Sequence, residues 1–525
     1  WGGTISRFRL LVSWRSTVSQ VSTPSSTSYV AAVVEFAPYY KRDDAPGTLR
    51  ANTDAYVRHI RTAAERDADI VVFPEDGLTS VGLPDRSGMD AWATRIPSVS
   101  ENCVPCTGND TRTLERLSCA ARDNRIYVVA NIAEKFSIHD RPTDPAYYNT
   151  NVVFDRDGKV VARYAYTLSS SVTPSTDRPR PLEHLVTFDT DFGVRFGTII
   201  CFDILFDKPA LDLTRLAGAT DIVYPTAWFS EAPFLTAVQT QRGWSFAEDV
   251  NLLAAGYSSP AFGNTGSGIY LGRDGTAGAF MSNEARDRLL IGRVAKKRQV
   301  RRLNGSNVQE RTTNRPPISL EDERSGNEQQ RSNNESVIKL LHDKFEHYVS
   351  LSLREGSTAK TLCHGNLCCD FLVEADKLDP SSEYRIAAYD GLRFYGTQVE
   401  AGIRVCGLIQ CANRSIISCG SVLDSETTFR TLQITARFEL SPRDLVMPSV
   451  LSSSLLPLDD GLFSFSTPDA DLVSDMGPKV SFSCFSLAAT DIHVARDKRK
   501  RRTRRCLLFV PFDRPSQENA SSRSS

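Results

Sequence analysis

Short apolar runs rich in β-branched residues alternate with helical segments from residue 28 to about residue 280, and this alternation restricts the fold more than any other feature. Such runs predict buried strands, and the amphipathic stretches between them predict helices that cover a sheet. This order is typical of a layered α/β domain. Strands are expected over 28–36, 68–75, 125–134, 149–166 (a hairpin turning at residues 155–158), 195–206, 221–229, 251–259 and 266–280, and helices over 48–66, 111–123, 209–217 and 233–247.

The chain has 525 residues, more than a single hydrophobic core usually supports, so we expect two domains with flanking segments. A polar, charged stretch separates the α/β part from a cysteine-rich part with strand-like patterns. The predicted organisation is a disordered segment at 1–27, an α/β domain at 28–295, a polar linker at 296–336, a smaller β-rich domain at 337–490 and a basic, polar tail at 491–525.

Charge and hydropathy argue against several classes of partner. The formal net charge is −1, so no overall field attracts nucleic acid or an anionic membrane. The apolar stretches fall short of the roughly 20 residues that span a bilayer, and the polar C-terminus does not resemble a lipid-anchor signal. The basic run KRKRRTRR at 498–505 is interpreted as part of a solvated tail. We therefore expect a small-molecule partner, and the sequence leaves the oligomeric state open.

Cysteine usage indicates an oxidising compartment. Six of the 12 cysteines cluster between Cys363 and Cys419 in a spacing that fits no common zinc pattern, so disulfides are predicted there. Cys103 and Cys106 lie on a predicted loop and are expected to pair with each other or elsewhere, and Cys119 lies on a helix, either in the core or in a disulfide. Five N-x-S/T sequons agree with a secreted glycoprotein: Asn109, Asn304, Asn334, Asn413 and Asn519.

Two residues with reactive side chains follow the ends of predicted strands. Glu75 follows the apolar run in VVFPEDGL, and Cys201 follows the one in GTIICFDILF. Ligands of layered α/β folds gather at the carboxyl ends of strands, where a carboxylate and a thiol could act as base and nucleophile. Taken singly, each has a plainer interpretation, because a lone cysteine in an apolar strand is usually a small core residue and a strand-end glutamate is usually solvated.

Together these segments resemble a known superfamily. Phe-Pro-Glu after one apolar strand, Cys-Phe-Asp after another and YPTAW at 224–228 are similar to the signature of the nitrilase-type amidases. Closer detail resembles the vanin/biotinidase family, from about Ser28 to at least Gly420, and includes NTNVVFDRDGKVVARY, TGSGIY, KTLCHGNLCCDFLVEADK and VCGLIQC.

The resemblance implies a nitrilase-type α-β-β-α sandwich followed by a smaller β-rich, disulfide-rich domain. It implies hydrolysis of a linear amide, pantetheine or a biotinyl amide, through a thioester and without metal or organic cofactor. Glu75 would be the general base and Cys201 the nucleophile. Trp228 would line the substrate site, the alternative being simple core packing.

The chain departs from this family at one position. The family's hairpin ends in a form like Arg-Tyr-(His or Arg)-Lys, whose lysine stabilises the oxyanion together with a backbone N–H beside the cysteine. Here Arg163 and Tyr164 match, but Ala165 and Tyr166 follow, and no lysine occurs between Lys159 and Lys208. Lys159 stands at the start of the strand, roughly 15 Å too early. Arg163 is the nearest cation, but its match to the family's arginine suggests a structural place.

The missing lysine predicts weak amidase activity, because removal of one oxyanion donor typically lowers the rate by about 10²–10³. One explanation is a catalytically inactive secreted glycoprotein with a binding or scaffold role. The other is an imperfect sequence that is misjoined around 165–181, which the absence of an initial methionine favours. Resequencing the transcript across 160–185 distinguishes the two.

Overall fold

The computed structural model describes most of the chain. The described residues are 21–107, 112–138, 141–167, 185–297, 319–322, 338–395, 399–439, 441, 443–452, 454–458, 462–466, 479–485 and 504–512. Most of the predicted N-terminal segment and of the predicted linker lies outside these residues, as do the sequons Asn109, Asn304, Asn334 and Asn519. No helix in the described ranges has the length and apolar character needed to cross a membrane.

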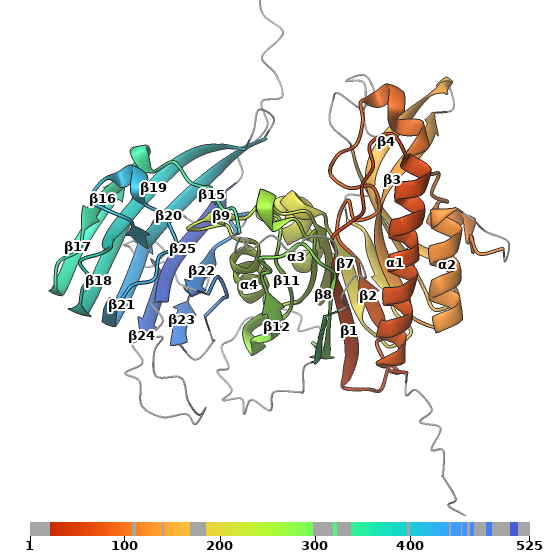
Figure 1. Cartoon of the computed structure of the whole chain (residues 1–525). Coiled ribbons are helices and arrows are strands. Elements are labelled where there is room, and N and C mark those ends of the chain that lie inside the picture. Colours follow the sequence, from red (N-terminus) through yellow and green to blue (C-terminus); the bar gives the residue numbers. More distant parts are fainter. Residues whose placement is uncertain are drawn as a thin grey trace, which may run out of the picture.

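Two stacked sheets form the N-terminal part (Figure 1). The first has the order β14-β13-β1-β2-β3-β4-β5, with β1 (Ser28–Glu35), β2 (Ile70–Val72), β3 (Tyr127–Ile138), β4 (Arg141–Phe154), β5 (Val160–Thr167), β13 (Arg288–Ala295) and β14 (Ser319–Asp322). The second has the order β12-β11-β10-β8-β7-β6, with β6 (Thr187–Asp189), β7 (Arg195–Thr198), β8 (Asp221–Thr226), β10 (Asn251–Gly256), β11 (Ser267–Leu271) and β12 (Thr276–Phe280). Their facing surfaces share one core, in which Val33 and Val129 of the first sheet join Val223 and Leu253 of the second.

Helices cover both outer faces (Figure 1). α1 (Ala45–Glu65) and α2 (Thr113–Asn124) pack on the first sheet, and α3 (Asp212–Arg215) and α4 (Ala237–Glu248) pack on the second. α1 begins earlier than predicted because the Asp44 carboxylate accepts a hydrogen bond from the Gly47 N–H at 2.9 Å and caps the first turn. This arrangement confirms the predicted α-β-β-α sandwich.

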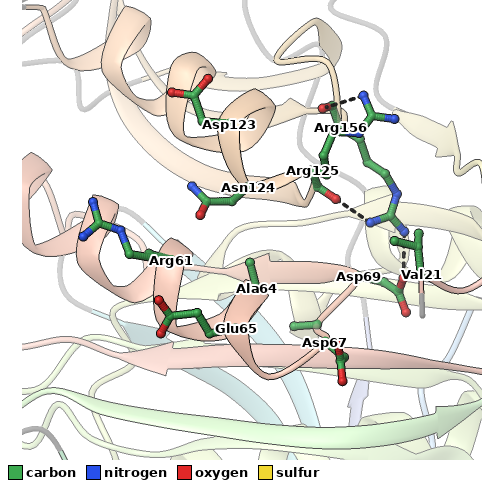
Figure 2. Close-up of a pocket in the computed structure, with 11 residues that line it drawn as sticks. Val21, Arg61, Ala64, Glu65, Asp67, Asp69, Asp123, Asn124, Arg125 and Arg156 are labelled. Atoms are coloured by element: carbon green, nitrogen blue, oxygen red, sulfur yellow. Dashed lines mark hydrogen bonds and ion pairs between the residues drawn. The ribbon is translucent and has the colours of Figure 1, made fainter. Parts of the chain in front are cut away.

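A hollow of about 540 Å³ lies at the amino ends of the strands, beside the C-terminus of α1 (Figure 2). Its most buried basic group is Arg156, whose guanidinium donates to Asp69 at 2.7 Å and to the Arg125 carbonyl at 2.6 Å. Because this guanidinium is already neutralised by a buried carboxylate, the hollow offers no free positive charge at Arg156 to an anionic ligand. Ligands of such folds gather at the opposite, carboxyl edge.

Glu35, at the end of β1, is a fully buried carboxyl group. It accepts hydrogen bonds from the Thr265 hydroxyl, the Gly266 N–H and the Ser267 hydroxyl. Burial raises the pKa of Glu35 from its ordinary 4.5 to about 7, although these hydrogen bonds act in the opposite direction. The folded protein therefore holds this proton over a pH range in which the unfolded chain has already released it.

We predict that Glu35→Gln removes part of the pH dependence of stability. Between pH 4.5 and 7 the wild-type loses stability as pH rises, because only the unfolded state gains from ionisation, and the loss at this site totals roughly 3 kcal/mol. The neutral amide cannot ionise in either state. Urea unfolding of both proteins at pH 5 and pH 8 measures the difference. Equal losses of stability between the two pH values would contradict the prediction.

In the described ranges, the C-terminal part forms two antiparallel sheets, each with five strands. One has the order β16-β19-β20-β25-β22 and the other β17-β18-β21-β24-β23, with β16 (Val349–Ser352), β17 (Gly356–His364), β18 (Leu367–Lys377), β19 (Glu383–Tyr395), β20 (Val399–Cys411), β21 (Thr428–Arg437), β22 (Met447–Ser452), β23 (Phe463–Ser466), β24 (Lys479–Phe485) and β25 (Arg504–Phe512). β22 packs on α4 (Figure 1), where a Cβ added at Gly243 would come within 2.4 Å of the Pro448 carbonyl oxygen. A short parallel pair, β9 (Glu231–Ala232) and β15 (Leu341–His342), also joins the two parts.

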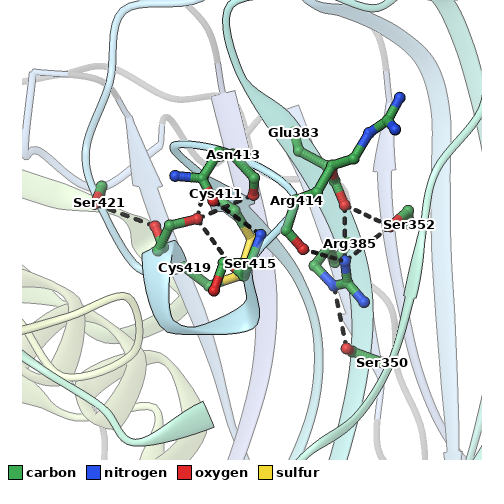
Figure 3. The surroundings of a disulfide bond; sticks show 11 residues. Ser350, Ser352, Glu383, Arg385, Cys411, Asn413, Arg414, Ser415, Cys419 and Ser421 are labelled. Atoms are coloured by element: carbon green, nitrogen blue, oxygen red, sulfur yellow. Dashed lines mark hydrogen bonds and ion pairs between the residues drawn. A yellow bond between two sulfur atoms is a disulfide. The ribbon is translucent and has the colours of Figure 1, made fainter. Parts of the chain in front are cut away.

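The clustered cysteines form disulfides, as predicted from their spacing. The pairs are Cys363–Cys368, Cys369–Cys406 and Cys411–Cys419, and a fourth bond joins Cys106 to Cys119 in the α/β part. Figure 3 shows the loop that Cys411–Cys419 closes, with Asn413 at its exposed side. There the Asn413 side-chain oxygen accepts a hydrogen bond from the Ser415 N–H at 2.8 Å.

Three segments differ from the sequence-based expectation. The strand predicted over 195–206 ends at Thr198, because the chain turns into a 3₁₀ helix at Cys201–Leu205. Residues 319–322, inside the predicted linker, form β14 beside β13. Residues 504–512, inside the predicted tail, form β25 between β20 and β22, since the apolar run LLFV that follows the basic residues favours a strand.

Candidate active site

Glu75 lies three residues after β2, at the carboxyl edge of the first sheet, and is 8% exposed. Its two carboxylate oxygens have different partners. Oε1 accepts a hydrogen bond from the Asn149 side-chain amide at 2.7 Å, and Oε2 accepts one from the Ala227 N–H at 2.9 Å. The second bond comes from the loop after β8, so the glutamate is held between the two sheets. Such fixed donors orient the carboxylate.

Cys201 follows the facing sheet, three residues beyond the end of β7, and its thiol lies close enough to the Glu75 carboxylate for the two groups to influence each other's ionisation. Its backbone φ is +53°, a left-handed conformation that a cysteine adopts only when the surroundings impose it. The Tyr224 hydroxyl donates to the Cys201 carbonyl at 2.7 Å and helps to hold this turn. The two residues predicted from strand ends far apart in sequence are thus brought together at one site.

Burial dominates the electrostatics of this pair. It raises the pKa of Glu75, with the hydrogen bonds from Cys201, Ala227 and Asn149 acting in the opposite direction. Burial and then the negative charge of Glu75 raise the pKa of the Cys201 thiol well above its ordinary range. A neutral thiol beside a carboxylate of raised basicity is the resting arrangement expected of a nucleophile that transfers its proton only when substrate binds.

A row of asparagines, two of them buried and Asn149 half-buried, connects Glu75 to the nucleophile strand. Asn131 of β3 donates to the side-chain oxygens of Asn149 at 2.5 Å and Asn151 at 3.0 Å. Asn151 in turn donates to the Thr198 hydroxyl at 2.9 Å and to the Ile199 carbonyl at 3.1 Å. The sequence motifs did not point to these residues. A signal was present, because amides inside otherwise apolar strands (VVANIAE, NTNVVF) must find buried partners.

The turn that carries Cys201 is also tied to β5. Asp203 accepts hydrogen bonds from the Ile200 N–H and from the Tyr164 hydroxyl, each at 2.8 Å. Burial raises the pKa of Asp203 to about 7, while these two donors lower it. Tyr164 therefore fixes β5 against the turn, and the residues that follow it on the same face of β5 extend toward the same edge of the molecule.

Trp228, two residues after β8, is 5% exposed and belongs to the core that joins the second sheet to α4. Its indole N–H donates to the Leu235 carbonyl at 2.8 Å, and its ring stacks on Phe202 with 5.8 Å between centroids. The indole is thus fully engaged by the protein. This placement agrees with core packing, and it sets the tryptophan against Phe202, the residue that follows Cys201 in the chain.

Arg163, the cation nearest to the family's lysine position in sequence, is bound elsewhere. Its guanidinium forms an ion pair with Glu134 at 2.5 Å, and Glu134 is fully buried. Glu134 also accepts a hydrogen bond from the Thr150 hydroxyl at 2.8 Å. Since neighbouring residues of a strand point to opposite faces, Arg163 faces away from the side that carries Tyr164. Arg163 has a structural place, as the sequence suggested.

We predict that Arg163→Met lowers the free energy of unfolding by about 3–5 kcal/mol, because it leaves the buried Glu134 charge without its partner. The double variant Arg163→Met, Glu134→Gln removes both charges and should recover much of that loss. Chemical unfolding of the three proteins measures both effects. If the single variant is as stable as the wild-type, the ion pair has no structural role and Arg163 becomes available for another one.

Comparisons with known proteins agree with this architecture. A carbon-nitrogen hydrolase model matches residues 31–244, and a vanin C-terminal domain model matches residues 338–490. Vanin-like protein 1 of Drosophila melanogaster is 38% identical, over 85% of this chain and 81% of its own. The pantetheinases of Sus scrofa and Homo sapiens are 30% and 31% identical, over 86% and 87% of this chain and 88% of each of theirs.

Proposed function

Because the chain belongs to the vanin family of carbon-nitrogen hydrolases, we propose that it hydrolyses a linear amide with Cys201 as nucleophile and Glu75 as general base. The family membership supports an amide-hydrolysing enzyme, and the proximity of these two side chains, at which the charge of Glu75 acts on the Cys201 thiol, supports their roles. That proximity carries the proposal, since a base must come within hydrogen-bond reach of the proton that it removes.

The proposed reaction runs in two halves. The Cys201 sulfur attacks the amide carbonyl carbon while Glu75 takes the thiol proton, and the carbonyl electron pair moves to the oxygen. The tetrahedral intermediate collapses as Glu75 returns the proton to the departing nitrogen, which breaks the C–N bond and leaves a thioester on Cys201. Water then attacks the thioester with Glu75 as base, the C–S bond breaks, and the products are a carboxylic acid and the free thiol.

Pantetheine is the substrate that the relatives favour, since two of the proteins compared above are named pantetheinases. A biotinyl amide is the second candidate, because it presents the same linear amide. Trp228 contributes to substrate binding through Phe202, whose ring it supports beside the nucleophile. The asparagine row keeps Glu75 oriented before substrate arrives.

We further propose that the protein acts outside the cell. The four disulfides among the side chains that the structure describes, three of them in the C-terminal part, are typical of proteins that fold in an oxidising compartment. The sequon asparagine Asn413 is exposed on the loop that Cys411–Cys419 closes, where a glycan would meet no packed neighbour.

The test is an assay of purified protein with pantetheine and with biocytin, in which cysteamine and free biotin are quantified against Cys201→Ala as the blank. Release of either product above the blank supports the proposal and identifies the substrate. Rates equal to the blank with both substrates contradict it. They would favour the alternative that the missing lysine raises, a secreted protein that keeps the fold for binding alone.

A further inference from the structure

We propose that Tyr166 replaces the family's lysine as the side-chain donor to the oxyanion, through a hydrogen bond from its phenol O–H. The inference rests on the proposed function and names the group that completes that site. Three features of the described residues support it: the register of β5, the contact surface that this strand presents to the Cys201 turn, and the exposure of the phenol.

The register places Tyr166 opposite the residue that holds the general base. In the antiparallel pair of β4 and β5, Tyr166 is the partner of Asn149, and Tyr164 is the partner of Asn151. Paired residues point to the same face of a sheet, with Cβ atoms about 4.5–5.5 Å apart. Since the Asn149 amide reaches Glu75 at 2.7 Å, Tyr166 stands on the face of the sheet that carries the reacting groups.

Tyr164, two residues before Tyr166 on the same face of β5, shows that this face is directed toward the Cys201 turn. Tyr164 reaches Asp203, two residues after Cys201, with 2.8 Å between the phenol oxygen and the carboxylate. Tyr166 lies one repeat of two residues further along, and the charge of Asp203 still acts on it. A side chain there is in range of the turn that bears the nucleophile without being packed beneath it.

The Tyr166 side chain is accessible, unlike Tyr164. It is 56% exposed, whereas Tyr164 is 6% exposed, and within the described ranges its hydroxyl has no hydrogen-bond partner. An exposed phenol on the face that holds Cys201 and Glu75 is available to a substrate carbonyl. Arg163, the neighbouring cation, is not, because Glu134 holds it on the other face.

A phenol can supply this interaction without transferring a proton. As the sulfur adds to the carbonyl, the developing alkoxide accepts a hydrogen bond from the Tyr166 O–H. This hydrogen bond weakens again when the thioester forms and the carbonyl is restored. Partial desolvation of the ring and then the charge of Asp203 raise the pKa of Tyr166 above its ordinary 10, so the phenol keeps its proton at neutral pH. A neutral donor is weaker than a lysine ammonium, which predicts a working but slower enzyme.

The experiment compares wild-type full-length protein with Tyr166→Phe, Tyr166→Lys and the matched control Tyr39→Phe, which removes the hydroxyl from a tyrosine of similar exposure, 52%, elsewhere on the surface. The readouts are kcat and KM for pantetheine, and the inhibition constant of a short aliphatic aldehyde, which adds to the thiol and places an oxygen at the oxyanion position. Thermal melting of each variant verifies its fold.

We expect Tyr166→Phe to lower kcat about 10²-fold with KM nearly unchanged, and to weaken aldehyde inhibition by a similar factor, while Tyr39→Phe matches the wild-type. A Tyr166→Phe protein with wild-type kcat overturns the inference and leaves the proposed function intact. If the wild-type is inactive but Tyr166→Lys is active, the tyrosine is no substitute, and the roles of Cys201 and Glu75 stand. If the wild-type and Tyr166→Lys proteins are both folded and inactive, the proposed function itself fails.

Discussion

Replacement of Cys201 by alanine is expected to lower the rate of amide hydrolysis by about 10⁴-fold or more, to the level of the uncatalysed blank. Among the described residues, no other partner of Glu75 could replace the sulfur, because the Asn149 amide and the Ala227 N–H are hydrogen-bond donors without nucleophilic character. The remaining site would still bind substrate, so the loss should fall on kcat. Steady-state assays over a range of pantetheine concentrations measure how the loss divides between kcat and KM.

Cys103 provides the matched control. It is the second free cysteine among the residues that the structure describes, it is half-buried like Cys201, and it lies on the loop before α2. Cys103→Ser should retain wild-type activity, because no member of the site contacts it. A thiol-specific alkylating agent should likewise inactivate the Cys103→Ser protein, and pantetheine should slow that reaction. If substitution of Cys103 abolished activity and substitution of Cys201 did not, the assignment of Cys201 as the nucleophile would be wrong.

The fold followed from local patterns because buried strands and covering helices have distinct periodicities. The strands at 28–36, 125–134 and 149–166 are found in the structure with shifted ends, since pairing with neighbours and capping, which depend on contacts distant in sequence, decide where an element stops. β25 was missed for the same reason. Its pairing partners, β20 and β22, lie far from it in the chain, and the basic residues beside it favoured a solvated tail.

The candidate site was predictable in part. Glu75 and Cys201 follow apolar runs, and the rule that ligands gather at the carboxyl ends of strands is enough to predict that the two residues share a site. The supporting groups were not predictable in that way. Asn131, Asn149 and Asn151 act through side-chain hydrogen bonds whose partners are set by the register of β3 and β4, and register is a property of the folded sheet.

Tyr166 illustrates the same limit from the other side. Along the sequence, it marks the position where a lysine is absent. Across the sheet, it is the exposed neighbour of Asn149 on the face that carries the nucleophile. The sequence alone predicts that the oxyanion donor is missing, whereas the sheet suggests the Tyr166 hydroxyl as its replacement. Only cross-strand pairing distinguishes an empty position from an occupied one.

Glu75→Gln is expected to lower kcat/KM by about 10²–10⁴-fold and to remove the acid limb of its pH profile. In the wild-type, Glu75 must be ionised to accept the thiol proton, and burial raises its pKa, so activity should fall as pH drops through a value above the ordinary 4.5 of a glutamate. The glutamine cannot ionise. Its residual rate should instead rise with pH, following ionisation of the Cys201 thiol, whose pKa burial keeps high.

Glu115→Gln is the control, because Glu115 is a glutamate of matching burial, 7% exposed against 8% for Glu75, on the outer helix α2. That variant should keep the wild-type rate and the complete acid limb. Initial rates with pantetheine from pH 4 to pH 9, in buffers of constant ionic strength, give the three profiles. An acid limb that persists in Glu75→Gln would mean that another group accepts the thiol proton. Asp203 is then the first residue to test, since burial raises its pKa to about 7 and it lies two residues from the nucleophile.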